Sequence, residues 1–500
     1  MAASLAAAAL PAATLDAAPK SGADRPNIIY IMLDDMPYDM LPHSDRYPFM
    51  ELPHLERLQK EGATFTNFFC TNSLSSPSRA TNLTGVYSHV HGVTQNLSAL
   101  DPDWDVTKPF SVFMQSAGYN TAFIGKIHMA SDAAHKGKGH IRPGFDYWVS
   151  FYGQGKYDDP QIVDNGKEIK KKGYMTDILN KYATDWLTSG RDKKKPFVMC
   201  LWHKAVHDPF TPADRHANLY SGVKIAPPAY RTDQDDLSDK PKYQRMVYDR
   251  DDPKKPLTFL DRRNPKPWDP RRRQQIGQLK TMSAVDDGIG QIMELLEKEG
   301  ILDNTIIMFS SDNGFFHNEH QKSDKRLAYE NSIRIPMVVR YPKAVKAGTI
   351  IDAMCLNIDV APTIVDFGGA AIPEQFQGVS LKGVLAGKAD PSWRQSFFYE
   401  YFFDNGLKGR VPDLVGIRTQ NWKYVYNTLL EGTDIDELYD LQADPGEMKN
   451  LFLDKGSASM LKELQKELQT MKELYRYNPD RNWRIKQISP NFKDRFDGKN

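Results

Sequence analysis

The sequence predicts an α/β fold: a mostly parallel sheet flanked by helices, followed by a smaller C-terminal domain of antiparallel sheet plus helix. Three observations support this prediction. Short apolar runs bounded by turn residues alternate with helical periodicity over most of the chain, as in β-α-β units. From about residue 391 the pattern changes to hairpin-like strands and one charged helix. With 500 residues, the chain is long enough for one large core and a second, smaller unit.

The predicted strands of the parallel sheet are short apolar runs, and the first is NIIYIML at Asn27–Leu33. Further runs of this kind occupy residues 121–124, 196–202, 305–309 and 336–340. Apolar residues from 276 to 296 recur at helical spacing and predict a long amphipathic helix. Ligands of such sheets bind at the carboxyl ends of the strands, so the residues that follow each run are the first candidates for a functional site.

The last part of the chain predicts a small antiparallel sheet covered by a helix. Residues 396–403 and 415–426 have the pattern of hairpin strands, and residues 457–475 form a charged amphipathic helix. Residues 226–273 are rich in proline and charge and predict a long ordered loop. We therefore expect three segments: a tail at residues 1–24, the main domain at residues 25–390 and a C-terminal subdomain at residues 391–500.

The composition excludes several classes of function. The formal net charge is +1, so no overall field favours nucleic acid or a membrane surface. Cys70, Cys200 and Cys355 are odd in number and far apart, which excludes a disulfide framework and a cysteine metal cluster. No apolar run reaches the roughly 18 residues of a transmembrane segment. Residues 2–20 are small and apolar, as in a trimmed export signal, which predicts a secreted or periplasmic protein; a disordered alanine-rich tail is the alternative.

Acidic and amide side chains follow two of the predicted strands. Asp34 and Asp35 follow the first strand, and Asp312 and Asn313 follow the strand at residues 305–309. A helix cap or a turn is the usual explanation for one such aspartate. Two pairs at matching strand ends favour a metal site, because crowded carboxylates repel each other unless a cation lies among them. An all-oxygen donor set suits a hard divalent cation.

Basic residues and histidines follow the same strand ends. They are Lys126 and His128, then His203, Lys204 and His207, and finally His320, Lys322, Lys325 and Arg326. Any one of these groups alone would be a solvated face or a satisfied core histidine. Together with Arg79, they would surround the oxygen-lined cation site with positive charge and imidazole. We therefore predict a site for an anion with several oxygens, sulfate or phosphate, with histidines placed for proton transfer.

The stretch TNSLSSPSRATNLTG at residues 71–85 places serines, one proline and Arg79 at the start of a predicted helix. A polar turn that caps the helix is the simplest explanation for the serines alone. The stretch also resembles the signature of the sulfatase family: cysteine or serine, any residue, proline, serine, arginine, then a short run to threonine-glycine. Its first position falls on Ser75. The resemblance continues through GKIH, the HDP at His207, SDNG, the lysine ahead of YENSIRIP, and ELYDLQADPGEMKNL.

This resemblance implies an alkaline-phosphatase-like fold, which agrees with the periodicity, and the hydrolysis of sulfate esters. In that family, a formylglycine-generating maturation enzyme oxidises the residue at the position of Ser75, and the formylglycine is the nucleophile. Carried over by position, the ligands of one Ca²⁺ ion are Asp34, Asp35, Asp312, Asn313 and the modified residue 75. The remaining catalytic groups fall on Arg79, Lys126, His128, His207 and Lys325.

The implied roles follow from the chemistry of a hydrated aldehyde, which carries two hydroxyls on one carbon. One hydroxyl attacks sulfur while the cation, Arg79, Lys126 and Lys325 hold the sulfate oxygens. His207, alone or with Lys325, gives a proton to the departing alkoxide. His128 then takes the proton of the second hydroxyl, so that the carbonyl reforms and sulfate leaves. An unmodified serine could form a sulfate ester but could not eliminate it in this way.

Two features depart from the family pattern. Position 75 is serine where many members have cysteine. The chain is therefore either a serine-type sulfatase matured by a radical enzyme, or an inactive form in which serine replaces a natural cysteine. The chain also reads NEHQKSDKR where relatives often read GEHGLYDKR, which adds Gln321 and Lys322 beside the expected sulfate pocket. We expect His320 and Lys322 to bind substrate.

The expected substrate is a sulfated carbohydrate. The segments GQGKYDDPQIVDNG and HKAVHDPFTP are similar to those of glycan-acting sulfatases, including N-acetylglucosamine-6-sulfatases. Arg262, Arg263 and residues 271–273 around Trp268 would add subsites if they face the cleft; otherwise this loop is structural. Two other classes remain open: a phosphomonoester or phosphonate hydrolase of the same superfamily, and a non-catalytic polyanion-binding protein if Ser75 is unmodified.

Overall fold

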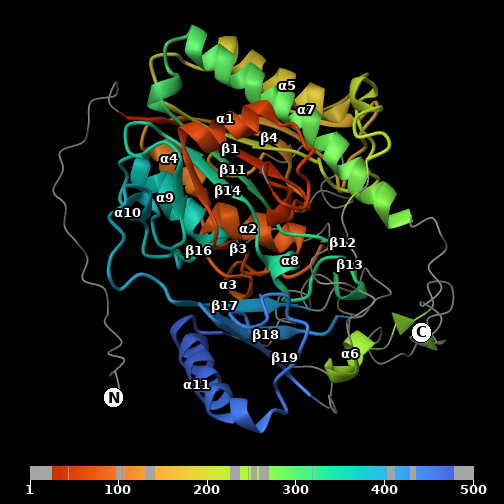
Figure 1. Ribbon diagram of the computed structural model, residues 1–500. Coiled ribbons are helices and arrows are strands. Elements are labelled where there is room, and N and C mark those ends of the chain that lie inside the picture. The colour runs from red at the N-terminus through yellow and green to blue at the C-terminus, as the bar shows by residue number, and fades with distance from the viewer. Residues whose placement is uncertain are drawn as a thin grey trace, which may run out of the picture.

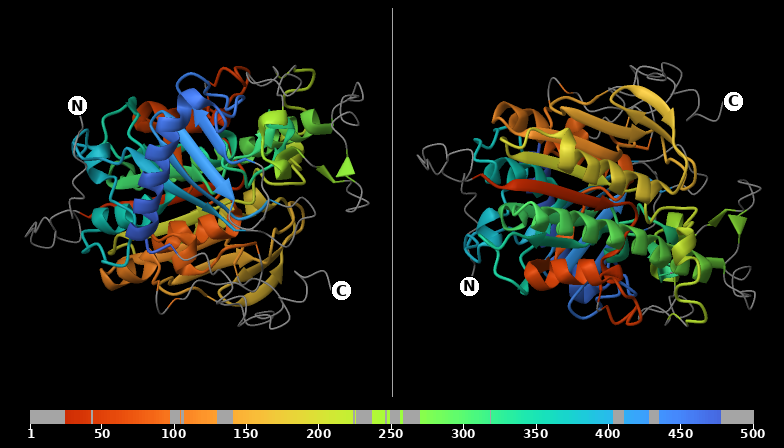
Figure 2. Two further views of the ribbon diagram at one scale, coloured as in Figure 1. Left: turned by 90° about the horizontal axis from the view of Figure 1, so that it is seen from below. Right: turned by 90° about the horizontal axis from the view of Figure 1, so that it is seen from above.

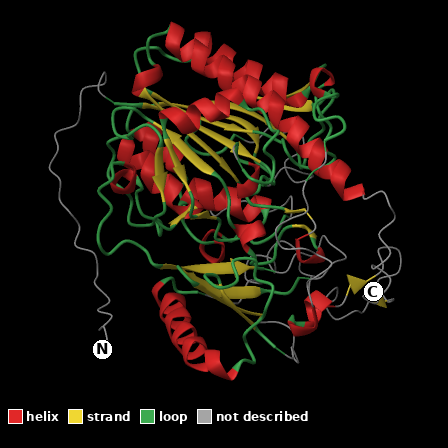
Figure 3. Cartoon of the chain, viewed as in Figure 1, coloured by secondary structure: helices red, strands yellow, loops and turns green. Residues whose placement is uncertain are grey.

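The computed structural model describes residues 25–42, 44–96, 104, 107–129, 141–223, 225, 237–245, 247–248, 256–257, 270–317, 319–402, 411–427 and 435–477. Within these residues, a large sheet with helices on both faces lies above a smaller sheet that carries one long helix on its outer side (Figures 1 and 3). The predicted tail at residues 1–24 lies outside the described residues. No described helix is both long enough and apolar enough to cross a membrane.

The large sheet has ten strands in the order β15-β2-β14-β11-β1-β8-β4-β5-β6-β7. Their bounds are β15 Thr349–Ile351, β2 Ala63–Phe65, β14 Met337–Arg340, β11 Thr305–Ser311, β1 Asn27–Leu33, β8 Phe197–Trp202, β4 Asn120–Lys126, β5 Tyr147–Phe151, β6 Gln161–Asp164 and β7 Lys167–Lys170. The five strands from β11 to β5 are parallel, whereas β14 and β6 pair antiparallel with their central neighbours. The predicted α/β fold with a mostly parallel sheet is therefore confirmed.

Helices cover both faces of this sheet. One face carries α1 (Pro53–Glu61), α5 (Met175–Asp185) and α7 (Pro270–Lys298), and the other carries α2 (Ser75–Thr84), α4 (Phe110–Ser116) and α9 (Val360–Phe367) (Figures 1 and 2). Successive side chains of a strand point to opposite faces. Ile29 and Ile31 accordingly belong to the core under α1, α5 and α7, and Ile28 and Tyr30 belong to the core under α2, α4 and α9. The whole of β1 is buried because both of its faces are covered.

The small sheet is antiparallel, as predicted, with the strands β17 (Ser396–Tyr401), β18 (Leu414–Thr419), β19 (Trp422–Asn427) and β20 (Glu437–Asp440) in that order. The helix α11 (Ala458–Leu474) buries Leu464 and Leu468 against it. Phe397 and Val415 of this sheet belong to the same core cluster as Ala80 of α2. The two sheets thus share one hydrophobic core, and the domain boundary near residue 390 stays a prediction.

The prediction of a loop at residues 226–273 is partly wrong. The long helix α7 begins at Pro270, so residues 271–273 belong to a helix and not to a loop. Proline favours the first helical position, because its missing N–H would have no partner there and its φ already suits a helix. Trp268, Arg262 and Arg263 lie outside the described residues. All three cysteines are buried and free, as the sequence indicated.

Candidate functional site

Four neighbouring parallel strands bring the predicted polar residues to one edge of the sheet. In the order β11-β1-β8-β4, each strand ends at this edge. Leu33 and Ser311, the last residues of β1 and β11, are in register, so Asp34 and Asp312 begin at the same level. The backbone N–H of Asp312 donates to the carbonyl of Leu33 at 3.1 Å, which continues the sheet pairing by one residue.

Three carboxylates and one amide meet at this edge, and all four side chains are almost fully buried. Oδ1 of Asp312 accepts hydrogen bonds from the backbone N–H of Asp35 at 3.1 Å and of Asn313 at 2.8 Å. The Asn313 amide donates to Oδ1 of Asp35 at 2.7 Å. The other amide atom, Oδ1 of Asn313, has no hydrogen-bond partner within the described part of the chain. A buried acceptor without a donor is what a cation ligand looks like before the cation binds.

Each carboxylate is also paired with a buried cation. The Nε of Arg79 donates to Oδ2 of Asp312 at 2.9 Å, and its Nη1 donates to the carbonyl of Lys126 at 2.7 Å. The Lys126 ammonium donates to Asp34, and the Lys325 ammonium donates to Asp35. Arg79, from α2, and Lys126, from the end of β4, thus join the strand-end acids as the sequence predicted.

Ser75 is the first residue of α2, and its hydroxyl faces this cluster. The hydroxyl donates to Oδ1 of Asp34 at 3.2 Å and accepts from Nζ of Lys325 at 3.2 Å. The residue at the N-cap position is Leu74, which makes no side-chain capping bond. The capping explanation for Ser75 is therefore wrong. The positive end of the helix dipole of α2 points at the same place, which favours an anion there.

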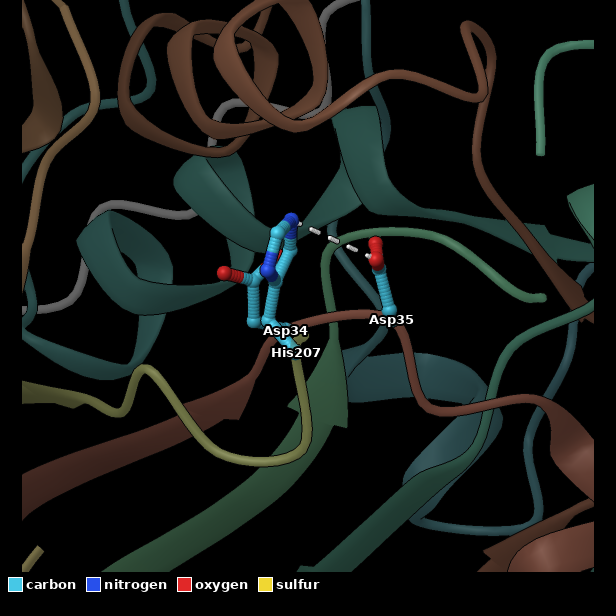
Figure 4. Close-up of side chains that lie close together, drawn as sticks. All are labelled: Asp34, Asp35 and His207. Carbon is cyan, nitrogen blue, oxygen red and sulfur yellow. Dashed lines mark ion pairs between the residues drawn. The ribbon is translucent and has the colours of Figure 1, made fainter. Parts of the chain in front are cut away.

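Two histidines lie beside the carboxylates. Nε2 of His207 is 3.7 Å from Oδ2 of Asp35, and Figure 4 shows the ring pointing toward that carboxylate. The His207 side chain is 16 % exposed, so one edge of the site reaches the surface. Asp34, Asp35 and His207 offer ligand atoms within 4.8 Å of one another, a spacing that could hold a metal ion. His128 is buried, and its Nδ1 has no partner among the described residues.

Burial dominates the protonation of these groups. It lowers the pKa of His207 to about 3, with Lys126 and Lys325 adding to the effect, and it lowers the pKa of His128 well below its usual value. Both rings are therefore neutral at pH 7. Burial, assisted by the neighbouring Asp34, raises the pKa of Asp312 to about 6. Burial also raises the pKa of Asp35, more than Lys325 offsets.

This donor set fits a hard divalent cation. The carboxylates and Asn313 Oδ1 are all oxygen donors, as Ca²⁺ prefers. A bound cation would coordinate the unpartnered amide oxygen of Asn313. It would also favour the ionised forms of Asp35 and Asp312 against the cost of burial.

The two residues predicted to bind substrate have other contacts in this structure. The ring of His320 is 1 % exposed and stacks on Tyr329 with the ring centres 4.0 Å apart. Nζ of Lys322 donates to the carbonyl of Gln244 at 2.8 Å. Their role in substrate binding stays a prediction.

Several polar residues near the site were missed from the sequence. The side-chain oxygen of Gln154 accepts a hydrogen bond from Lys126, and Gln154 follows the end of β5, another parallel strand. The apolar run YWVSF of that strand could have indicated it. Behind Asp35, Nε2 of Gln278 donates to the Asp35 carbonyl at 3.5 Å, and His317 is hydrogen-bonded to Gln278. No sequence signal marks this pair.

Comparison with known proteins gives consistent matches. The family model described as Sulfatase matches residues 26–370, and the model described as N-sulphoglucosamine sulphohydrolase, C-terminal, matches residues 318–474. The chain is 36 % identical to N-acetylglucosamine-6-O-sulfatase of Bacteroides thetaiotaomicron, over 92 % of this chain and 89 % of the relative. It is 28 % identical to N-acetylglucosamine-6-sulfatase of Homo sapiens, over 86 % and 82 % of the two chains.

Among solved structures, the fold is similar to that of a protein in complex with its substrate D-glucosamine-2-N,6-O-disulfate. The TM-score is 0.79 at 34 % identity, and the match covers 92 % of this chain and 100 % of the other.

Proposed function

The chain belongs to the sulfatase family, a family of sulfuric ester hydrolases, and on this premise we propose that it removes the 6-O-sulfate of a glucosamine-type sugar in a sulfated glycan. The proposed cofactors are one calcium ion and a formylglycine at position 75. The choice of sugar is supported by the relative that is 36 % identical over 92 % of this chain and by the substrate of the related solved structure.

The observation that carries the proposal is the position of the Ser75 hydroxyl. It lies 3.2 Å from a carboxylate oxygen of Asp34 and 3.2 Å from the ammonium of Lys325, and it makes no capping bond to its own helix. A side chain that begins a fully buried helix and contacts a buried acid and a buried cation suits a nucleophile better than a structural serine.

The proposed calcium ligands are Asp34, Asp35, Asp312, Asn313 and residue 75. When bound, the cation stabilises negative charge on the sulfate oxygens. The hydrated formylglycine supplies two hydroxyls on one carbon, which is the feature that an unmodified serine lacks.

The remaining roles belong to side chains of this site. Arg79, Lys126 and Lys325 would bind the sulfate oxygens and stabilise the charge that grows on them in the transition state. His207, at the partly exposed edge, would donate a proton to the sugar oxygen as its bond to sulfur breaks. A sulfate anion beside the ring favours the protonated form of His207, which burial and the neighbouring lysines disfavour. The neutral ring of His128 would accept the proton of the hydroxyl on residue 75.

We propose different roles for Lys322 and His320. Lys322 is partly exposed and lies three residues before Lys325, so we propose that it contacts a neighbouring sulfate of the glycan. His320 is almost fully buried against Tyr329, so for it we propose mainly support of the loop that carries Lys325. The small apolar residues at positions 2–20 support export to the periplasm or the medium, after maturation by a formylglycine-generating enzyme.

Two measurements test the proposal. Mass spectrometry of the peptide that contains residue 75, from protein made in the native host, should find a mass lower than that of the serine peptide by two hydrogens. The same protein should release sulfate from N-acetylglucosamine-6-sulfate much faster than phosphate from the 6-phosphate. Faster phosphate release would indicate a phosphomonoesterase. An unmodified serine without turnover would indicate a polyanion-binding protein.

A further inference from the structure

The strand β17 of the small sheet lies directly against the segment that leads into Ser75. The backbone N–H of Glu400 donates to the carbonyl of Thr71 at 3.1 Å. The ring of Phe397 stacks on Phe69 with centres 5.1 Å apart and planes at 30°. The C-terminal sheet therefore touches the chain just before the proposed nucleophile, although the two are more than 300 residues apart in sequence.

Between these two contacts, the hydroxyl of Tyr399 joins two parts of the site. It donates to the carbonyl of Arg326 at 2.9 Å and accepts from the backbone N–H of Ser73 at 3.4 Å. Arg326 is the residue after Lys325, and Ser73 lies two residues before Ser75. Tyr399 is 2 % exposed, so both bonds are shielded from bulk water.

The backbone around Lys325 needs such support. Asp324 and Arg326, on either side of it, have φ values of +77° and +93°, in a region that residues with a Cβ atom rarely adopt. Such conformations persist only where the surrounding structure holds them in place. The bond from Tyr399 holds the carbonyl of Arg326 and therefore restricts the peptide that follows Arg326, directly beyond Lys325.

We infer that Tyr399 is a positioning residue that fixes Lys325 relative to residue 75, which makes the C-terminal sheet part of the catalytic unit. This inference rests on the function proposed above. The hydroxyl of Tyr399 bonds the backbone of the two segments that carry Lys325 and residue 75, and Tyr399 acts through that backbone.

The test compares Tyr399→Phe with the matched variant Tyr424→Phe. Tyr424 lies in the same sheet, but among the described residues its hydroxyl bonds only Asp436 and Gln465, both of the C-terminal unit. We expect Tyr399→Phe, which removes both hydrogen bonds of the hydroxyl, to lower kcat about tenfold and to leave KM within about twofold. Rates are divided by the formylglycine and calcium contents, and melting temperatures are measured for both variants. Equal kcat values for the two variants would overturn the inference.

A double-mutant cycle with Lys325→Ala gives the sharper readout. If Tyr399 acts by placing Lys325, the loss from Tyr399→Phe should largely disappear when Lys325 is already absent. A full tenfold loss in both backgrounds would contradict that role and indicate general loosening of the fold. Full activity of Lys325→Ala would instead contradict the proposed function of the site. An impaired Lys325→Ala beside a normal Tyr399→Phe would overturn only the role of Tyr399.

Discussion

The charged groups at the edge of the parallel sheet are buried, and so are those between the two sheets except Glu330, which is 17 % exposed. In both places acids and bases are paired. We call the first set the reaction cluster: Asp34, Asp35, Asp312, Arg79, Lys126 and Lys325. We call the second set the interface cluster: Glu330 of α8 (Glu330–Ile333), with Arg418, Lys423 and Glu447 of the C-terminal unit. The two clusters differ in whether their polar atoms all have hydrogen-bond partners.

The interface cluster is closed. Lys423 contacts Glu330 at 2.8 Å and Glu447 at 2.6 Å, and Arg418 contacts Glu330 at 3.2 Å. The second oxygen of Glu447 accepts the backbone N–H of Glu330 at 2.7 Å. Burial would raise the pKa of Glu330, but the charges of Arg418 and Lys423 outweigh it and hold that pKa far below its usual value.

The reaction cluster is open. Oδ1 of Asn313 and Nδ1 of His128, which border it, have no partner in the part of the chain that the structure describes. Burial lowers the pKa of Lys126 to about 8, so this ammonium group of the reaction cluster loses its proton much more readily than an ordinary lysine. A closed buried network holds two elements together, whereas an open one has polar atoms that can still bind a ligand.

The largest effect should come from Asp312→Asn. This change keeps the shape but removes a carboxylate that we propose as a calcium ligand, so bound calcium should be lost. Sulfatase activity should fall by at least about a thousandfold, since the charge stabilisation at the sulfate is lost with the ion. Metal analysis of the washed protein and initial rates provide the measurement. Undiminished calcium in this variant would show that the ligand assignment is wrong.

The next effect should come from Lys423→Met, which opens the interface cluster. Two buried carboxylates would then lose their shared cation, so the free energy of unfolding should fall by about 3 kcal/mol. Urea titration provides the measurement. Calcium content and kcat of the folded variant should be unchanged, in contrast to Asp312→Asn.

A matched control is Lys382→Met. Lys382 pairs with Asp366 at 2.8 Å, but its side chain is 48 % exposed, so this loss should be below about 1 kcal/mol. Similar losses for the two variants would contradict the view that the interface cluster holds the sheets together.

A smaller and more selective effect is expected for His207→Ala. If His207 donates the proton to the leaving oxygen, a sugar sulfate should be hydrolysed about 100-fold more slowly. An activated aryl sulfate, whose leaving group needs no proton, should be affected far less. The control is His216→Ala, because His216 lies near Asp287, outside the reaction cluster. Equal losses on the two substrates would exclude the proposed role.

The reaction cluster could be predicted because its residues follow strands. Asp34 comes directly after an apolar run and Asp312 shortly after one, and neighbouring parallel strands must end at the same edge. The sequence of its helix could not predict that the Ser75 hydroxyl faces the reaction cluster, since a serine at the start of a helix usually caps it. It followed only from the resemblance to a family.

The interface cluster and Tyr399 could not be predicted in the same way. Lys423 and Glu330 meet through the packing of two sheets, and no local pattern encodes which faces will touch. The antiparallel pairing of β14 with β11 could not be predicted either, because the pattern of a buried apolar run does not indicate the direction of the strand in the sheet. The Pro270 start of α7 was missed because charge and proline density suggested a loop.

His89 and Glu400 form a single closed pair at the same interface. Nδ1 of His89 contacts Oε2 of Glu400 at 2.7 Å, and its Nε2 lies 2.9 Å from the carbonyl of Tyr475. Both ring nitrogens thus face acceptors, which only the protonated ring can satisfy. Tyr87, Phe398 and Tyr477 pack around the ring and carry no charge at neutral pH.

Burial would lower the pKa of His89, but the Glu400 carboxylate outweighs it and raises the pKa above 6.5. The folded state therefore holds this proton more tightly than the unfolded state. The stabilisation is complete below about pH 6.5 and is lost as the pH rises through the higher folded value, by about 1.4 kcal/mol for each unit of the shift. His89→Gln does not titrate, so the fall in melting temperature above pH 6.5 should be shallower in this variant than in the wild type. The pH profile of kcat should be the same for both, because a closed pair controls stability and not the chemistry. If the melting temperatures of the two proteins fall equally with pH above pH 6.5, His89 is not protonated in the folded state.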